Sequence, residues 1–262
     1  SCTRLTMVTV SGKNVYQVVI IGAGPVGGRL ATELSSRGIS TLMIEEHAEI
    51  GRPFQCAGLV NPPAMKMVGL EDTILQNVDG ALIHSPSGIM VPVGKDGRTR
   101  THVVCRKRFD QGVVAQAMES GAHLWLLSKP IEAEVTDECV NLKVDREGEI
   151  VDLKCALLVG ADGAHSWTRR YFKMGRPKEM MVGFQTDVSG LTGKDNWLEM
   201  YTGRDFAPGL FAWVIPTGNN THRIGIWSRP QDLDGKSVEQ CYNDLISHPL
   251  WSKRFENVKE IA

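Results

Sequence analysis

Three glycines follow the pattern G-x-G-x-x-G at Gly22, Gly24 and Gly27, and an acidic residue, Glu45, comes after the next apolar run. In this pattern the first glycine permits a tight turn, the second lets the backbone approach a pyrophosphate, and the third lets a helix pack closely on a strand. N–H groups at the start of that helix would bind the phosphates, and Glu45 would accept hydrogen bonds from ribose hydroxyls. The spacing therefore predicts a dinucleotide site; a purely structural turn is the competing interpretation.

The elements around this motif fit a strand–helix–strand unit. Residues 15–21 (VYQVVII) form a β-branched run of the kind buried in parallel sheets. Residues 29–36 carry apolar side chains at helical spacing, and residues 39–44 predict a second strand that ends at Glu45 and Glu46. A strand, turn, helix and strand within some thirty residues make a βαβ unit.

The remaining chain shows two patterns. A helix is predicted at residues 106–120, and a buried strand at residues 156–159. Alternating stretches predict a small antiparallel meander at residues 123–127, 131–135, 140–144 and 150–153. Shorter strand-like pieces lie at residues 81–84 and 89–93. Beyond residue 175, an antiparallel sheet and a helix are predicted from residues 181–188, 197–201, 210–215, 223–227 and 237–247.

We therefore predict an α/β chain with two domains after an irregular segment at residues 1–14. Residues 15–175 form a Rossmann-like dinucleotide-binding domain with a three-layer (ββα) arrangement. Part of the substrate region is inserted into it near residues 60–104. Residues 176–262 form an antiparallel substrate-binding domain.

Composition excludes several classes of protein. The 262 residues contain 29 Lys+Arg and 30 Asp+Glu, a net charge of −1, which does not suggest a nucleic-acid binder. A basic cluster at residues 98–108 could be a polyanion patch, although a solvated face is the simpler interpretation. The six cysteines form no CxxC pair and the histidines no zinc pattern, so we expect reduced thiols in a cytoplasmic protein without a metal. No apolar run approaches the roughly 20 residues of a membrane span, so we expect any membrane contact to be peripheral.

The glycine motif suits NAD and FAD equally, and two later segments separate them. Arg106 opens a helix in RKRFD, and Asp162 and Gly163 follow a strand in GADG. With these segments the sequence resembles the p-hydroxybenzoate hydroxylase superfamily of FAD enzymes. The resemblance implies FAD as the cofactor, with Arg106 near the flavin–ribityl chain and the Asp-Gly turn close to the pyrophosphate. Taken alone, an Asp-Gly pair is more often only a turn.

Two further segments resemble the geranylgeranyl reductase family. Residues 51–59 (GRPFQCAGL) are similar to its IGxPxxCAG segment, and residues 208–216 (PGLFAWVIP) are similar to its PxxYxWxFP signature. This family comprises FAD enzymes that saturate isoprenoid double bonds, for example in archaeal membrane lipids. The resemblance implies that Cys56 lies close to the isoalloxazine ring. Phe211 stands where the family has Tyr, and Ile215 where it has Phe, which removes a phenol but keeps an apolar lining.

These observations define the expected site. Phe211 and Trp213 share one face of a predicted strand and, with Pro216, are the expected substrate-binding residues; plain core packing is the competing interpretation. Cys56 is the candidate proton donor, although a lone cysteine is often only a small buried apolar residue. The residues expected to contact FAD are Gly22, Ala23, Gly24, Pro25, Val26, Gly27, Glu45, Glu46, Arg52, Cys56, Ala57, Gly58, Arg106, Asp162 and Gly163.

The leading hypothesis is an FAD-dependent reductase that transfers a hydride from flavin N5 to a prenyl-lipid double bond, with NAD(P)H or a ferredoxin as electron donor. The alternatives are an FAD-dependent monooxygenase of the aromatic hydroxylase type and a non-catalytic FAD-binding protein. Family members also carry a third FAD segment, a GDAAG-like turn, and no such turn occurs before Ala262. The resemblance therefore implies a C-terminally truncated chain, a fragment of a longer protein with weakened FAD contacts.

Overall fold

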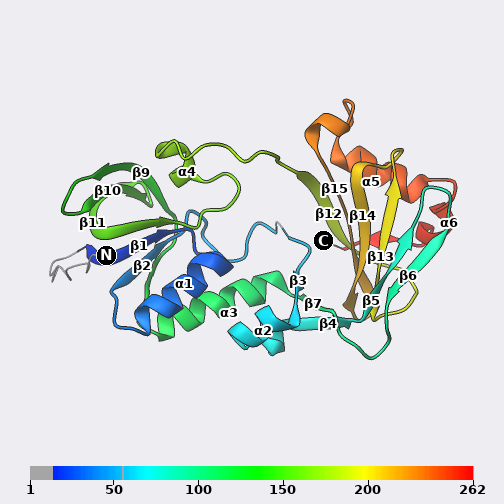
Figure 1. Cartoon of the computed structure of the whole chain (residues 1–262), viewed down its shortest axis with the longest axis horizontal. Helices are drawn as coiled ribbons and strands as arrows, with labels where there is room; N and C mark the ends of the chain where they lie inside the picture. Colours follow the sequence, from blue (N-terminus) through cyan, green and yellow to red (C-terminus); the bar gives the residue numbers. More distant parts are fainter. Residues whose placement is uncertain (1–13, 55, 262) are drawn as a thin grey trace, which may run out of the picture. The chain divides into compact units, whose positions relative to one another are not determined.

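The structure is a computed structural model that describes residues 14–54 and 56–261 (Figure 1). The segment predicted to be irregular, residues 1–14, lies outside the described residues except for Asn14. The chain divides into two compact units. The first runs to Phe54 and resumes at residues 107–176, and the second comprises residues 55–106 and 177–262.

A six-stranded sheet forms the centre of the first unit, in the order β8-β2-β1-β11-β10-β9. β1 pairs in parallel with β2 and with the second half of β11, and β2 pairs in parallel with β8. β10 is antiparallel to β9 and to the first half of β11. The strands are Val15–Ile21 (β1), Thr41–Ile44 (β2), His123–Trp125 (β8), Ser128–Val135 (β9), Val140–Arg146 (β10) and Glu149–Gly160 (β11).

Two hydrophobic clusters on opposite faces of β1 make this unit three layers deep (Figure 1). Val18 and Ile20 belong to the cluster formed with helices α1 (Pro25–Ser35) and α3 (Arg106–Glu119). Val19 and Ile21 belong to the cluster formed with the β9–β11 meander. Successive side chains of a strand point to opposite faces, so one apolar run serves both cores. The predicted three-layer Rossmann-like architecture is confirmed.

Two details of the predicted meander were wrong. Residues 123–127 were expected to join it, but β8 instead extends the parallel sheet beside β2. Residues 150–153 and 156–159 were expected as separate strands, but they form one strand, β11. Its first half lies in the meander and alternates in burial, whereas its second half pairs with β1. The change of apolar pattern therefore marks a change of partner rather than a turn.

The second unit contains a seven-stranded sheet in the order β16-β12-β15-β14-β13-β5-β6. It is antiparallel except for the β13–β5 pair. The predicted pieces near residues 81–84 and 89–93 supply β5 and β6. The strands are Gly80–His84 (β5), Met90–Gly94 (β6), Val182–Ser189 (β12), Trp197–Gly203 (β13), Ala207–Gly218 (β14), Thr221–Ser228 (β15) and Lys259–Glu260 (β16).

Smaller elements complete the chain. A three-stranded sheet in the second unit has the order β3-β7-β4. Helix α5 begins with a capping box, because the Ser237 and Gln240 side chains each accept a hydrogen bond from the other residue's backbone N–H. The remaining elements are Leu59–Val60 (β3), Pro62–Val68 (α2), Glu71–Thr73 (η1), Ile74–Val78 (β4), Thr101–Val104 (β7), Trp167–Tyr171 (α4), Pro230–Asp232 (η2), Val238–Ser247 (α5) and Ser252–Phe255 (α6). Among the described residues, no helix has the length and apolar character needed to cross a bilayer.

Helices α5 and α6 pack on one face of the large sheet, and a charged cluster connects α6 to β13. Arg254 of α6 donates to Glu199 Oε1 at 2.6 Å, and the Tyr201 hydroxyl donates to the same carboxylate. His84 Nε2 lies 3.6 Å from Glu199 Oε2. Burial alone would raise the pKa of Glu199, but the nearby His84 and the hydrogen bonds from Arg254 and Tyr201 outweigh it and lower the pKa to about 2. The buried carboxylate therefore remains ionised and holds the helix on the sheet.

Candidate active site

The glycine turn lies at the carboxyl end of β1. Gly22 has a φ of +99°, which favours glycine, and its N–H donates to the carbonyl of Ile44 at 2.7 Å. A Cβ on Gly27 would overlap the carbonyl oxygen of Gly22, so only glycine lets α1 approach the turn this closely. These two glycines therefore serve the fold, as the spacing predicts.

Gly24 differs, because a Cβ placed on it would meet no described atom within 4 Å. Its φ of −78° is accessible to any residue, so the protein itself gives no reason for glycine here. Gly24 is also the N-cap of α1, and no side chain among the described residues caps that helix. The first-turn N–H groups of α1 and the open space over Gly24 fit a pyrophosphate.

The other residues of the turn differ in exposure. Ala23 is buried, whereas Val26 is 73% exposed and Pro25 occupies the first helical position of α1. Proline is well suited there because its missing N–H has no partner inside the helix.

Glu45, directly after β2, has most of its carboxylate occupied by the protein. Oε2 accepts from the Ala23 N–H at 3.1 Å, and Oε1 accepts from the His47 N–H at 3.0 Å and lies 2.6 Å from His47 Nδ1. An ionised carboxylate offers about four acceptor sites. One therefore remains for a ribose hydroxyl, and Glu45 also ties the glycine turn to β2. Its neighbour Glu46 lies 3.7 Å from Lys129 Nζ.

The Asp162-Gly163 turn lies beside the glycine turn. Ala161 donates its N–H to the carbonyl of Ile21 at 2.7 Å, and a Cβ on Gly22 would stand 3.0 Å from the Cα of Asp162. Asp162 Oδ2 accepts from the N–H of Thr168 at 2.9 Å and from its hydroxyl at 3.1 Å. The structure thus brings together the two turns assigned to the pyrophosphate. Thr168, which fixes the Asp162 side chain, was not found from the sequence.

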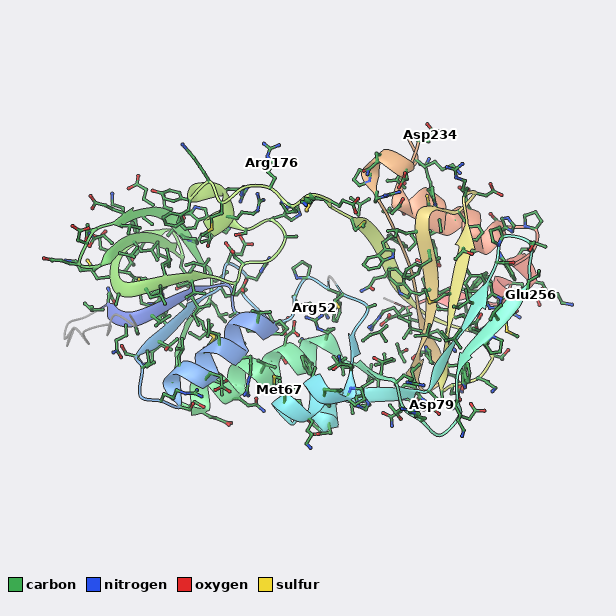
Figure 2. All side chains as sticks on the ribbon, in the orientation of Figure 1. Arg52, Met67, Asp79, Arg176, Asp234 and Glu256 are labelled. Carbon is green, nitrogen blue, oxygen red and sulfur yellow. The ribbon has the colours of Figure 1, made fainter. Side chains whose placement is uncertain are left out.

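Cys56, Ala57 and Gly58, the Cys56 loop, lie in the second unit. The Cys56 side chain is exposed, and its Sγ accepts a hydrogen bond from the Gly58 N–H at 3.5 Å. A Cβ on Gly58 would stand 3.5 Å from Cγ of Arg106, so the structure places the predicted arginine beside this loop. Arg52 (labelled in Figure 2) belongs to the first unit, where its guanidinium lies 4.2 Å from the centroid of the Phe54 ring.

Three aromatic side chains share one face of the large sheet, opposite the face covered by α5 and α6. Phe211 and Trp213 are two residues apart on β14 and therefore point to the same face, and Trp227 of β15 is the cross-strand partner of Phe211. Each pair of these rings meets edge to face, with centroids 5.6 to 6.4 Å apart. We call Phe211, Trp213 and Trp227 the aromatic surface. Gly225 faces Trp213, and a Cβ there would overlap the indole.

The other predicted substrate residue is placed differently. Pro216 is buried and shares the strand face of Val214, which belongs to the core under α5 and α6. Trp227 was missed from the sequence. Trp227 and Gly225 are two residues apart on a predicted strand, which indicates that they share a strand face. Only the pairing of β15 with β14 places Trp227 beside Phe211.

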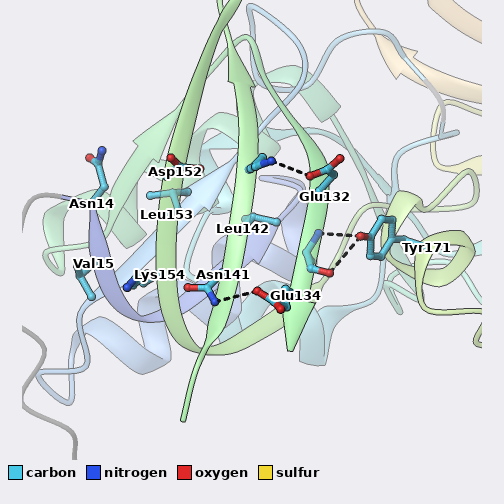
Figure 3. A pocket seen from close by; sticks show the side chains of 12 residues that line it. Asn14, Val15, Glu132, Glu134, Asn141, Leu142, Asp152, Leu153, Lys154 and Tyr171 are labelled. Carbon is cyan, nitrogen blue, oxygen red and sulfur yellow. Dashed lines mark hydrogen bonds and ion pairs between the residues drawn. The ribbon is translucent and has the colours of Figure 1, made fainter. Parts of the chain in front are cut away.

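A surface pocket lies elsewhere in the first unit, over the outer face of β9, β10 and β11 (Figure 3). Tyr171 closes one side, where its hydroxyl donates to the carbonyl of Ala133 at 3.1 Å and accepts from the N–H of Ala133 at 3.0 Å. Lys143 and Glu132 form an exposed ion pair at 2.9 Å in the same wall. None of the expected site residues lines this pocket.

Comparison with known families agrees with the geometry of the glycine turn. The FAD binding domain family matches residues 15–250, most of the chain. The chain therefore belongs to this family, and FAD is its cofactor. The match to FAD rather than NAD confirms what the resemblance implied.

Individual relatives narrow the likeness. A digeranylgeranylglycerophospholipid reductase from Methanocaldococcus jannaschii is 32% identical over 95% of the chain and 63% of its own length. A protein of the same name from Methanosarcina acetivorans is 28% identical over 82% of the chain and 54% of its own length. The chain thus spans between 54% and 63% of the length of these two relatives.

Among solved structures, a geranylgeranyl bacteriochlorophyll reductase-like protein from Thermoplasma acidophilum has a TM-score of 0.81 at 24% identity. The alignment covers 96% of this chain and 65% of that one. A flavin-dependent brominase has a TM-score of 0.77 at 20% identity, covering 95% of this chain and 65% of that one. These likenesses show the fold, which several flavin chemistries share.

Proposed function

We propose that this member of the FAD binding domain family is a reductase of carbon–carbon double bonds in prenyl lipids. The observation that carries the proposal is the aromatic surface of the second unit, which lies on the sheet face opposite α5 and α6. Its Trp213 packs against the cluster of Val78 and Val103, and its Trp227 is 39% exposed. The surface suits a long hydrocarbon chain, which offers few polar groups for recognition. The relatives named digeranylgeranylglycerophospholipid reductase support the same substrate class.

The two units would bind different parts of the cofactor and substrate. In the first unit, the glycine turn and the Asp162-Gly163 turn would hold the pyrophosphate, and Glu45 would accept one ribose hydroxyl. Glu46 and Arg52 would contribute the outer contacts to the cofactor. In the second unit, Arg106 and the Cys56 loop would contact the flavin half, and the aromatic surface would hold the prenyl chain.

Reduced flavin, when bound, supplies a hydride to one carbon of the double bond. An isolated alkene is a poor electrophile, so the protein must align it and deliver a proton to the other carbon. Cys56 is our candidate donor because its thiol is exposed and its Sγ is oriented by the Gly58 N–H. The apolar rings would exclude water from the reacting bond. We propose NAD(P)H or a ferredoxin as the electron source. We also propose that the protein is cytoplasmic and meets its lipid substrate at the membrane surface.

The test is anaerobic incubation of the reduced FAD-loaded protein with a geranylgeranyl phospholipid, followed by mass spectrometry. Each saturated bond adds two hydrogens to the lipid. We expect this gain with the wild-type protein, a strong loss with Cys56→Ala, and wild-type behaviour with Cys139→Ala, which removes a cysteine from the meander of the first unit. If no double bond is lost, and the protein consumes oxygen in a separate aerobic assay with NAD(P)H and an aromatic substrate, the monooxygenase alternative replaces this proposal.

A further inference from the structure

Arg223 carries a buried charge in the second unit. It lies on β15, is 6% exposed, and forms a two-pronged ion pair with Asp187 of β12. Its Nε donates to Oδ1 at 2.7 Å and its Nη2 to Oδ2 at 3.0 Å. Such a pair fixes the plane of the guanidinium. The remaining nitrogen, Nη1, is thereby aimed in one direction.

Nη1 donates to the carbonyl of Ala57 at 2.8 Å. The two neighbouring carbonyls of the Cys56 loop are also occupied, that of Cys56 by Gln185 Nε2 at 3.2 Å and that of Gly58 by the Val104 N–H at 2.8 Å. Three consecutive carbonyls therefore accept from fixed donors, while the Cys56 thiol stays exposed. The backbone of the loop is held, and the side chain is left open.

The same strand carries part of the aromatic surface. Arg223, Gly225 and Trp227 share one face of β15, opposite Ile215, Trp213 and Phe211 of β14. Arg223 and Trp227 are four residues apart, which corresponds to about 13 Å along the strand. Ala57 packs in one apolar cluster with Ile215 and Trp213, so the loop lies at one end of this surface.

We propose that Arg223 is a positioning residue that, with Asp187 and Gln185, holds the Cys56 loop at a fixed distance from the aromatic surface. The inference rests on the proposed function, because it matters for turnover only if Cys56 and the aromatic surface serve one reaction. Transfer of a proton and a hydride to neighbouring carbons requires donor and substrate to be aligned closely. β15 supplies that alignment, since it carries both the anchor of the loop and one wall of the surface.

The main test variant is Arg223→Lys, which keeps the charge but lacks the fork needed to hold Asp187 and Ala57 together. Gln185→Ala removes only the anchor on the Cys56 carbonyl and leaves the buried ion pair intact, so it serves if the first variant does not fold. Arg229→Gln is the matched control, because it removes an arginine from another arginine–aspartate pair of the same unit, with Asp232. Hydrogen exchange of the Gly58 and Val104 amides reports the loop directly, and kcat and KM with a geranylgeranyl lipid report the reaction.

We expect exchange at Gly58 and Val104 to rise at least about tenfold in Arg223→Lys, as for the loss of one charged hydrogen bond, and less in Gln185→Ala. We also expect kcat to fall by a similar factor with KM little changed, and the control to match wild type. Unchanged exchange in a folded Arg223→Lys or Gln185→Ala variant would overturn the anchoring. Raised exchange with unchanged kcat would overturn the positioning role. If the wild-type protein saturates no prenyl bond, the proposed function fails, and exchange alone then decides whether Arg223 anchors the loop.

Discussion

Replacement of Gly24 by alanine separates binding from folding at the glycine turn. The backbone of Gly24 has φ −78° and ψ −174°, and a Cβ there meets no described atom within 4 Å. Alanine should therefore change the free energy of unfolding by less than about 1 kcal/mol, because the gain from a less flexible unfolded chain and the loss of a favourable N-cap nearly cancel. The methyl group would, however, occupy the space that we assign to the pyrophosphate.

The expected loss of affinity follows from the hydrogen bonds displaced. A hydrogen bond to a charged group contributes about 1.5–3 kcal/mol, and about 1.4 kcal/mol corresponds to a tenfold change in Kd. Loss of one amide–phosphate contact in Gly24→Ala should weaken binding of ADP and of FAD by roughly 10- to 100-fold. Calorimetric titration measures the affinities, and urea unfolding measures the stability.

Two further variants of the first unit serve as controls. Gly27→Ala would place a Cβ over the carbonyl oxygen of Gly22, so it should destabilise the protein by about 1–3 kcal/mol. Met118→Ala trims an exposed side chain of α3 and should leave both stability and ADP affinity close to wild type. If Gly24→Ala binds ADP as tightly as the wild-type protein, the pyrophosphate does not approach Gly24 and our assignment of the turn is refuted.

Three further predictions concern the buried cluster, the thiols and the aromatic surface. The folded pKa of Glu199 lies near 2, below its ordinary value of 4.5, so its stabilisation is present above about pH 4.5 and is lost as the pH falls toward 2. The difference corresponds to about 3 kcal/mol, so wild-type stability should fall by about that much more than that of Glu199→Gln between pH 5 and 2; parallel urea-unfolding curves would contradict this. Burial raises the pKa of Cys155 to about 12, so at pH 8 iodoacetamide should label exposed Cys56 and spare Cys155, and equal labelling in peptide mass spectra would contradict this interpretation. Trp227→Ala should weaken binding of a geranylgeranyl lipid by about tenfold through lost apolar area, whereas Trp227→Phe should retain most of it; equal affinities measured with all three proteins would remove Trp227 from the surface.

The sequence predicted those parts of the site that depend on local backbone geometry. Gly22 and Gly27 are required by a turn and a close approach within a few residues, so their roles follow from spacing. The strand ending at Gly160 lies next to β1, and this pairing brings Asp162 beside Gly22. The strand at residues 156–159 was predicted correctly, but its predicted burial was wrong, because Leu157 is 54% exposed.

Long-range register was the part that the sequence could not supply. Arg223 reaches Ala57 across 166 positions of the chain, and no pattern in β15 alone indicates that partner. Gln185 and Asp187 likewise look like ordinary polar positions of an alternating strand until β12 is paired with β15. The occupation of Glu45 by His47 was also missed, because it depends on a side-chain conformation rather than on spacing.

The two units are proposed to bind different halves of FAD, so a variant in one unit should affect only the half that this unit binds. ADP carries only the half of FAD that the first unit is proposed to bind, so Gly24→Ala should weaken ADP and FAD by similar factors. Arg223 lies in the second unit, so Arg223→Lys should leave ADP affinity unchanged and alter only what depends on the Cys56 loop. A loss of ADP binding in Arg223→Lys would mean that the variant has disturbed more than the loop. Unchanged ADP affinity together with altered kcat would locate the effect at the flavin end of the site, where the proposed reaction takes place.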